Sequence, residues 1–110
     1  MPQFTSNVNF EHVAREWRCK FSKDNEMASL AAIQAVTDGV IANIKAVDGV
    51  TGVQRIVCGG CLDYKLIITL TADKFPNIEA SGLEAPFLEA IGKIEGVTSV
   101  ETQSFTIAPM

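Results

Sequence analysis

A short motif occurs twice in this chain and limits what it can fold into. Residues 47–54 read VDGVTGVQ, and residues 94–101 read IEGVTSVE. In each copy a glycine follows an acidic residue at the end of an apolar segment with helical spacing, a position typical of the left-handed residue that closes a helix. The β-branched residues that follow favour a strand. The chain is therefore predicted to consist of two similar halves, each passing from helix through glycine into strand.

Composition limits the possible classes of protein. The 110 residues are 47% hydrophobic and 20% charged, which predicts one folded domain, residues 1–110, and excludes disorder. A net charge of −4 argues against binding to nucleic acid, because no basic cluster is present to contact phosphates. No apolar run reaches the length of a membrane span, and residues 1–7 do not resemble a secretory signal. We therefore expect a soluble, cytoplasmic protein with no membrane partner.

The order of the predicted elements is β-α-β-β-α-β. The patterns predict strands at 8–21, 53–58, 61–72 and 97–107, a first helix at 26–47 with Asp24 or Asn25 as its N-cap, and a second helix starting near Pro86. Gly59-Gly60 is typical of a hairpin turn, and a short helical turn is expected at 76–80. These elements predict an α+β, ferredoxin-like fold, in which two helices cover one face of a four-stranded antiparallel sheet with strand order 4-1-3-2.

The apolar alternation of the first predicted strand changes phase partway along. Phe10 and His12 share one parity, whereas Trp17, Cys19 and Phe21 share the other. A β-bulge at 13–15 would return both groups to the same face and place His12 beside the apolar residues. The alternative is an extended tail that ends near His12, followed by a shorter strand. The sequence leaves both interpretations open.

The sheet face without helices carries mixed residues in this interpretation. The expected set is Glu16, Arg18, Lys20, Lys65, Ile67, Thr69 and Thr71. A solvated face of this kind suits a monomer. However, Ile67, Val57 and the apolar residues of the last strand favour a second sheet packed against this face, with charges paired between the two. A homodimer is therefore the second possibility.

Several short segments resemble one known family. They are Glu11-His12-Val13 leading towards Trp17 and Lys20-Phe21, then Asp48-Gly49-Val50, Asp63-Tyr64 and the final strand at 100–109. Together they resemble the stress-responsive dimeric α/β-barrel (Dabb) proteins. Members with this architecture include cofactor-free monooxygenases and a plant polyketide cyclase. The resemblance implies a homodimer whose two sheets form a barrel, with a small apolar pocket in each subunit.

The resemblance also implies a role for His12, which matches a histidine that serves as a pocket acid or base in the family. The family's later His-Pro-x-His segment is absent, because residues 82–87 read GLEAPF and His12 is the only histidine. A mechanism with two histidines is therefore not implied. His12 with Tyr64 is the candidate catalytic pair. The alternative is a surface histidine and a core tyrosine.

Two other groups of residues have more than one interpretation. Trp17, Phe21 and Phe87 either form a ligand-binding wall or belong to the core. Cys58-Gly59-Gly60-Cys61 suits structural cysteines, a redox pair or half of a zinc site. We expect free thiols and no tightly bound zinc under reducing conditions, although a disulfide across the turn is possible. The arginines at 15, 18 and 55 suit either an anionic ligand or a solvated surface.

The sequence therefore supports two hypotheses of function. The first is a small homodimeric barrel that binds a small apolar or aromatic molecule, with cofactor-free proton-transfer chemistry of a cyclase or monooxygenase type. The second is a non-enzymatic stress-response or interaction protein that uses the barrel as a dimerisation scaffold. A pocket lined by His12, Trp17 and Tyr64 would favour the first hypothesis, and a filled interior would favour the second.

Overall fold

A computed structural model describes residues 3–110 of the chain. Its elements in order are β1 (Gln3–Thr5), β2 (Val8–Asn9), β3 (His12–Lys20), α1 (Asp24–Lys45), β4 (Val50–Cys58), β5 (Asp63–Thr71), a 3-10 turn η1 (Ala72–Lys74), α2 (Pro76–Ala80), α3 (Glu84–Gly92) and β6 (Thr98–Ile107). Strands β3 to β6 form one antiparallel sheet in the order β4-β5-β3-β6. This order is the predicted one, read from the other edge.

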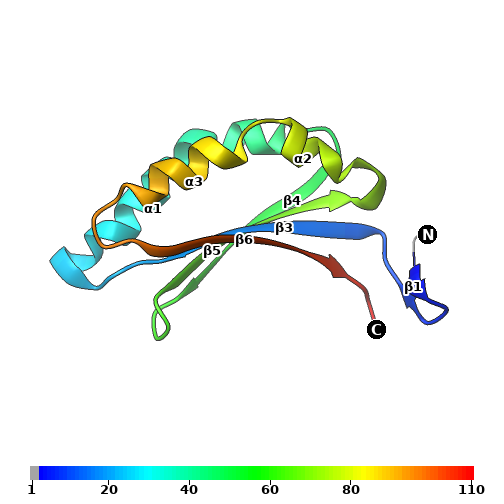
Figure 1. Cartoon of the computed structure of the whole chain (residues 1–110), viewed down its shortest axis with the longest axis horizontal. Coiled ribbons are helices and arrows are strands. Elements are labelled where there is room, and N and C mark those ends of the chain that lie inside the picture. Colours follow the sequence, from blue (N-terminus) through cyan, green and yellow to red (C-terminus); the bar gives the residue numbers. More distant parts are fainter. Residues whose placement is uncertain (1–2) are drawn as a thin grey trace.

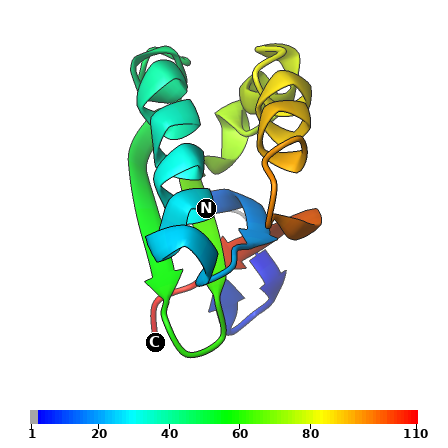
Figure 2. The same ribbon diagram turned by 90° about the vertical axis from the view of Figure 1, so that its left-hand side faces the viewer.

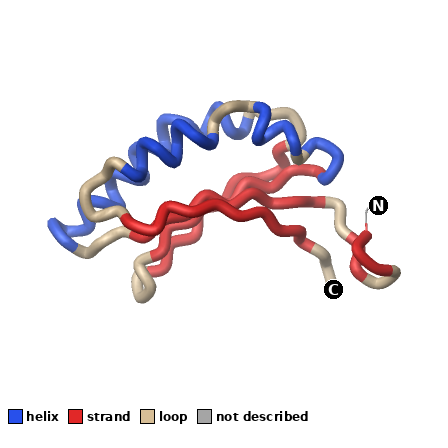
Figure 3. Tube along the Cα trace, viewed as in Figure 1, coloured by secondary structure: helices blue, strands red, loops and turns tan. Residues whose placement is uncertain are grey.

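The helices all cover the same face of the sheet. Figures 1 and 3 show α1, α2 and α3 on one side of the strands, with the other side uncovered. In the end view, α1 and α3 stand side by side over the sheet (Figure 2). The predicted α+β, ferredoxin-like class is confirmed, as is the short helix at 76–80.

The core lies between this helical layer and the sheet. It is built mainly from the alternate apolar residues of β3 and β5, together with the inward side chains of α1 and α3; the most buried are Trp17, Cys19, Tyr64, Leu66, Ile68, Leu70, Ile33, Ile44 and Ile91. Helix α1 is long and apolar enough, by length and composition, to cross a membrane. Ile33 and Ile44 of this helix pack into the core over the sheet, and 22% of its apolar window is buried.

The repeated motif forms the turns that lead into β4 and β6. Gly49 and Gly96 adopt φ angles of 101° and 93°, in the left-handed region predicted for them. A Cβ atom on Gly49 would lie 2.4 Å from the Cβ of Lys74, and one on Gly96 would lie 2.8 Å from the Oγ of Ser22. Both glycines are therefore required by backbone conformation and by close packing. The helices themselves end a few residues earlier, at Lys45 and Gly92.

The predicted bulge in the first strand is wrong. β3 pairs with β5 in unbroken register from His12↔Thr71 to Lys20↔Asp63, so His12 lies on the face opposite Trp17. The alternative of a shorter strand starting near His12 is correct. The residues before it form a small separate hairpin, β1–β2, which extends away from the sheet (Figure 1). The rings of Phe4 and Phe10 stack there with their centroids 4.9 Å apart.

The start of α1 also differs from the prediction. Neither Asp24 nor Asn25 caps it: the N-cap position is Lys23, and no side chain bonds to the first turn. Asn25, Glu26 and Met27 have left-handed φ angles of 54°, 57° and 66°, so regular helical geometry begins only after them. Consecutive left-handed residues other than glycine are unfavourable, so no pattern in the sequence indicates this turn.

Candidate functional site

The structure does not bring His12 and Tyr64 together. His12 lies at the first residue of β3, opposite Thr71, whereas Tyr64 lies opposite Cys19 near the other end of the strand. The two side chains also belong to opposite faces of the sheet, because His12 shares the parity of Glu16 and Tyr64 faces the helices. The predicted pairing of His12 with Tyr64 is therefore wrong, and its physical reason is the absence of the bulge.

Tyr64 is instead a core residue whose hydroxyl group is held by α1. Its Oη atom lies 2.7 Å from Thr37 Oγ1 and donates a hydrogen bond of 3.2 Å to Gln34 Oε1. Burial raises the pKa of Tyr64, and the hydrogen bond with Thr37 opposes that shift only in part. The phenol therefore remains protonated near neutral pH and serves as a buried polar contact between sheet and helix.

Trp17, Phe21 and Phe87 fill the interior. All three are buried, and the rings of Trp17 and Phe87 lie with their centroids 5.0 Å apart. This contact joins β3 to α3 across the core. Of the two interpretations given by the sequence, the packing supports that of core residues.

A polar cluster lies on the helix-facing side of the sheet, between β3, β6 and α3. Glu84, the first residue of α3, accepts hydrogen bonds from Arg15 Nε at 2.6 Å, Arg15 Nη2 at 3.2 Å and Trp17 Nε1 at 2.7 Å. The same guanidinium group donates to Ser104 Oγ and Thr102 Oγ1 on β6, both at 2.9 Å. One carboxylate and one guanidinium thus tie α3 to two strands of the sheet.

The hydrogen bonds determine the charge state of Glu84. The contact with Arg15 holds the pKa of this carboxyl below its usual range; burial opposes the effect, and the bond from Trp17 adds to it. Glu84 is therefore ionised at neutral pH. Arg15 uses four N–H contacts on these partners, so one of its five N–H groups has no hydrogen-bond partner among residues 3–110.

A cavity of about 210 Å³ opens beside this cluster. Its walls combine polar groups of the cluster, the apolar residues that precede and form α2, and the carboxylate of Glu79; the lining residues are Arg15, Phe75, Pro76, Ile78, Glu79, Glu84 and Ser104. The volume is below the range of roughly 300–1,000 Å³ typical of sites for drug-sized ligands, so the cavity suits a small molecule. The arrangement offers an apolar wall and a cationic hydrogen-bond donor on the same side of the sheet.

From the sequence, Arg15 was only one of three candidate arginines, and Glu84 was not a candidate site residue. The signal that was available is parity: Arg15 shares the alternation of Trp17, Cys19 and Phe21, so it faces the helical layer. A charged residue directed into an apolar layer requires a partner of opposite charge. Glu84 carried no comparable signal, because an acidic residue at the start of a helix is common for local electrostatic reasons.

The uncovered face of the sheet carries charges that pair within the chain. Asp63 contacts Lys20 Nζ at 2.9 Å and Arg18 Nη2 at 3.1 Å, and Glu16 lies 3.9 Å from Lys65 Nζ. The sequence favoured pairing of these charges with a second sheet. Because they pair within the chain, they do not require a second sheet to neutralise them.

The apolar residues of the uncovered face also differ from expectation. Val57 lies opposite Tyr64 and so faces the helices, which corrects its assignment to this face. Its neighbour Ile56, 48% exposed, lies opposite Lys65 on the uncovered face, as does Ile107, 47% exposed, opposite His12.

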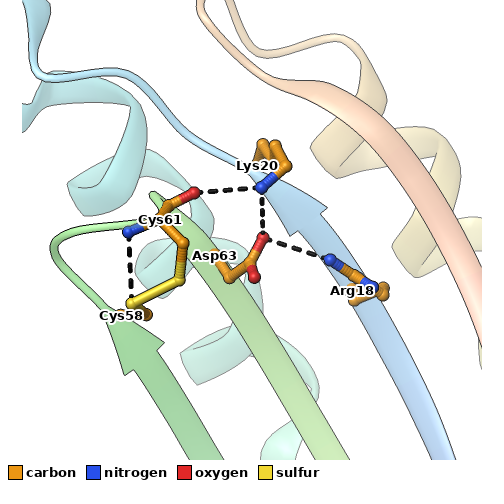
Figure 4. Close-up of a disulfide and its surroundings, with 5 residues drawn as sticks. All are labelled: Arg18, Lys20, Cys58, Cys61 and Asp63. Atoms are coloured by element: carbon orange, nitrogen blue, oxygen red, sulfur yellow. Dashed lines mark hydrogen bonds and ion pairs between the residues drawn. A yellow bond between two sulfur atoms is a disulfide. The ribbon is translucent and has the colours of Figure 1, made fainter.

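Cys58 and Cys61 are joined by a disulfide across the hairpin turn between β4 and β5 (Figure 4). Cys19, the third cysteine, is a buried free thiol. Within residues 3–110, no three side chains of the His, Cys, Asp or Glu type lie close enough to hold a metal ion. That the two hairpin cysteines become free thiols under reducing conditions stays a prediction.

Comparisons with known proteins give structural matches only. No protein family and no curated protein matches the chain by sequence. Among solved structures, the chain is similar to a monooxygenase from the ActVA-Orf6 gene of Streptomyces coelicolor in complex with nanaomycin D, with a TM-score of 0.67 and 14% identity over 92% of this chain and 88% of the other. These values indicate a shared fold.

Two further structures give the same result. SnoaB, a cofactor-independent oxygenase from Streptomyces nogalater, matches with a TM-score of 0.62 and 14% identity, covering 91% of this chain and 96% of that protein. A putative antibiotic biosynthesis monooxygenase from Deinococcus radiodurans matches with a TM-score of 0.59 and 12% identity, covering 89% and 94%. The chain therefore has the ferredoxin-like fold of these oxygenases along nearly its whole length.

Proposed function

We propose that this chain is a soluble, cytoplasmic protein that forms a homodimeric α/β barrel and binds a small aromatic or apolar molecule in the cavity beside Arg15 and Glu84. The observation that carries the proposal is the cavity itself, which places a guanidinium group next to the apolar residues Phe75 and Ile78. The fold shared with a cofactor-independent oxygenase and with a monooxygenase in complex with nanaomycin D supports the same class of ligand.

The lining residues suggest how such a ligand would be held. The unpartnered N–H of Arg15 would donate to an acceptor oxygen, such as a carbonyl or phenolate, while the ring would lie against Phe75 and Ile78. Glu84 is committed to Arg15 and Trp17, so its role would be to hold the guanidinium in place. If the protein is an enzyme, the chemistry expected is cofactor-free oxygenation or proton transfer on the bound ring.

The ligand proposal can be tested through the only tryptophan of the chain. Trp17 bonds to Glu84 at the cavity wall, so its fluorescence should report on binding. We expect saturable quenching by the small hydroxynaphthoquinone juglone, and weaker binding of the larger nanaomycin D, because the cavity is about 210 Å³. Arg15→Gln should weaken the affinity about tenfold, because a charge-assisted hydrogen bond is lost.

The matched control is Arg55→Gln, since Arg55 lies on β4 and contacts Gln34 of α1, away from the cavity. Ser104→Ala is a second test, because it changes the cavity wall without breaking the pair of Arg15 and Glu84. Absence of saturable quenching, or equal affinity in the Arg15→Gln and Arg55→Gln proteins, would contradict the proposal.

The dimer proposal has its own matched pair of variants. Ile56 and Val57 are neighbours and are exposed to similar extents, but Ile56 lies on the uncovered face and Val57 on the helix side. We expect a mass of about twice 11.9 kDa by light scattering at micromolar concentration. Ile56→Lys should lower the measured mass to that of the monomer, and Val57→Lys should leave the mass unchanged. A monomer in the unmodified protein would refute the barrel.

A second candidate function is a non-enzymatic interaction or stress-response protein that uses the barrel as a scaffold. The filled interior favours it, because Trp17, Tyr64 and Leu66 occupy the space between sheet and helices where a larger pocket was expected. A dimer in solution together with no binding of either quinone would support this second function over the first.

A further inference from the structure

The tip of the β4–β5 hairpin combines two cysteines with exposure to solvent. Cys58 is the last residue of β4, Cys61 precedes β5, and their Cα atoms lie 5.6 Å apart with the disulfide between them. Gly59, Gly60 and Cys61 are exposed, and Cys58 is half-buried. The sulfur of Cys61 is therefore on the part of the turn that a thiol in solution can reach.

The surroundings of the pair favour a negatively charged sulfur. The backbone N–H of Cys61 donates to Cys58 Sγ at 3.2 Å, and Lys20 Nζ bonds to the carbonyl oxygen of Cys61 at 3.0 Å (Figure 4). A thiolate accepts hydrogen bonds and attracts cations more strongly than a thiol does. Redox pairs elsewhere often obtain this stabilisation from a helix N-terminus. Here an N–H group of the turn contacts Cys58 Sγ directly, while the ammonium group of Lys20 contacts the carbonyl oxygen of Cys61 and is itself paired with the carboxylate of Asp63.

The ammonium group is fixed in its position. Lys20 also bonds to Asp63 Oδ1 at 2.9 Å, and Arg18 bonds to the same carboxylate oxygen at 3.1 Å. Figure 4 shows the two cations of β3 converging on Asp63, next to the hairpin turn. Since Asp63 lies directly opposite Cys58 in the ladder, this network is attached to the hairpin at the level of the disulfide.

The third cysteine is kept away from this chemistry. Cys19 lies opposite Tyr64 in the ladder and faces the helices, whereas Cys58 lies opposite Asp63 on the uncovered face. Burial, with a smaller contribution from Asp63, raises the pKa of the Cys19 thiol to about 11, although Arg18 opposes the shift. Cys19 is therefore a protonated, inaccessible thiol, and only Cys58 and Cys61 can exchange.

We propose that Cys58 and Cys61 form a thiol–disulfide exchange site for a low-molecular-weight thiol of the glutathione class. The thiolate of one glutathione attacks Cys61 Sγ, and the bond between the two protein sulfurs breaks. The electron pair leaves on Cys58, whose thiolate accepts the N–H of Cys61. A second glutathione thiolate then attacks the glutathione sulfur of the mixed disulfide and releases Cys61.

The exchange is balanced in electrons and protons. Two glutathione molecules lose two electrons and become glutathione disulfide, while the protein disulfide gains them and becomes two thiols, which take up the two protons that the glutathione thiols release. The reverse reaction closes the hairpin. Because the β4–β5 ladder continues from the turn to Val50 and Leu70, the fold is retained in both states.

The test uses the full chain in buffers of varied ratio of glutathione to glutathione disulfide, with thiols trapped by a maleimide and counted by intact mass. We expect two of the three cysteines to change state together and Cys19 to stay reduced. Cys58→Ser should accumulate one glutathione on Cys61. A pair that stays reduced at every ratio, a disulfide that never opens, or stoichiometric zinc on the reduced protein would overturn the proposal.

The contribution of Lys20 has a matched control on the same face of the sheet. Lys20→Gln removes the ammonium group that favours the reduced, thiolate-bearing form, so the pair should need a ratio of reduced to oxidised glutathione about fivefold higher to open. Lys65→Gln, which removes a lysine that contacts Glu16, should leave the midpoint unchanged. Equal midpoints in both variants would refute the role of Lys20.

Discussion

Arg15 and Arg18 lie three residues apart on β3 and therefore on opposite faces of the sheet, and their environments show how differently the two faces use the same residue. Arg15 faces the helical layer, where Glu84, Thr102 and Ser104 take up most of its donors beside a cavity. Arg18 faces the uncovered side, where it shares Asp63 with Lys20. The two guanidinium groups are equally shielded, with side chains 24% and 23% exposed, so the difference lies in the partners. On the covered face one guanidinium has its own carboxylate, whereas on the open face two cations share one carboxylate and Arg18 Nε is buried without a hydrogen-bond partner among residues 3–110.

The largest expected effect comes from two consecutive isoleucines of β5. Ile68 is fully buried under the helices, so Ile68→Ala should lower the free energy of unfolding by about 4 kcal/mol, because a core cavity is created. Ile67 lies on the uncovered face, where it is 5% exposed but has no helix packed over it, so Ile67→Ala should cost less. Urea unfolding of the two variants measures the difference.

The same pair of variants also tests assembly. If the uncovered faces pack together in a dimer, the cost of Ile67→Ala should depend on protein concentration, and that of Ile68→Ala should change much less. Equal and concentration-independent costs for the two variants would contradict the packing of two uncovered faces against each other.

The next effect concerns the hairpin disulfide on the open side. Reduction should lower the free energy of unfolding by at most about 2 kcal/mol, because the disulfide closes only a very short loop. Comparing urea curves with and without reductant measures this loss. A protein with serine at both positions should show no response to reductant; a response there would show that the effect does not arise from the hairpin disulfide.

A smaller effect is expected at the polar cluster of the covered face. Glu84→Gln should lower the free energy of unfolding by about 1 kcal/mol, since Arg15 and Trp17 lose a charged acceptor at a site that water partly screens. Asp63→Asn on the open face is the counterpart: its carboxylate bonds both Lys20 and Arg18, and its side chain is 14% exposed against 27% for Glu84, so we expect a loss of similar size. A clear difference between the two losses would mean that the two clusters do not contribute alike.

The pH dependence of stability should distinguish the same two carboxylates. The pKa of Glu84 is lowered in the folded state, first by Arg15, so its contribution is complete above the ordinary glutamate pKa of about 4.3 and is lost as the pH falls through the folded value. The pKa of Asp63 is also lowered, with its hydrogen bond to Lys20 as the largest cause, so its contribution to stability is likewise lost as the pH falls. Acid titrations of unfolding should therefore be flatter in either variant than in the unmodified protein.

The fold could be predicted from the sequence because its signals are local and periodic. The alternation in β5, the helical spacing of α1 and the two glycines each indicate one element, and the order of the elements fixes the topology. The position of His12 could not be predicted in this way. A phase change in a strand has the same sequence pattern whether a bulge or a strand start causes it, and only the pairing with β5 decides between them.

The candidate site was harder to predict for a similar reason. Arg15 and Glu84 are separated by 69 positions, and nothing near either residue in sequence indicates the other. Their contact arises only when α3 packs over β3. The chemistry of the hairpin, in contrast, was visible as a C-x-x-C pattern, because both cysteines belong to one turn.

The central place of β3 has a consequence for how the chain reaches its folded state. β3 is the first strand of the large sheet in sequence, yet it pairs with β5 on one edge and with β6 on the other. During synthesis it would be exposed on both edges until β5 is made, and its second edge would stay open until residues 98–107 follow. Contacts between segments so distant in sequence slow folding. The step that limits the rate is therefore expected to be the docking of β6, and any aggregation should begin at the unpaired edge of β3.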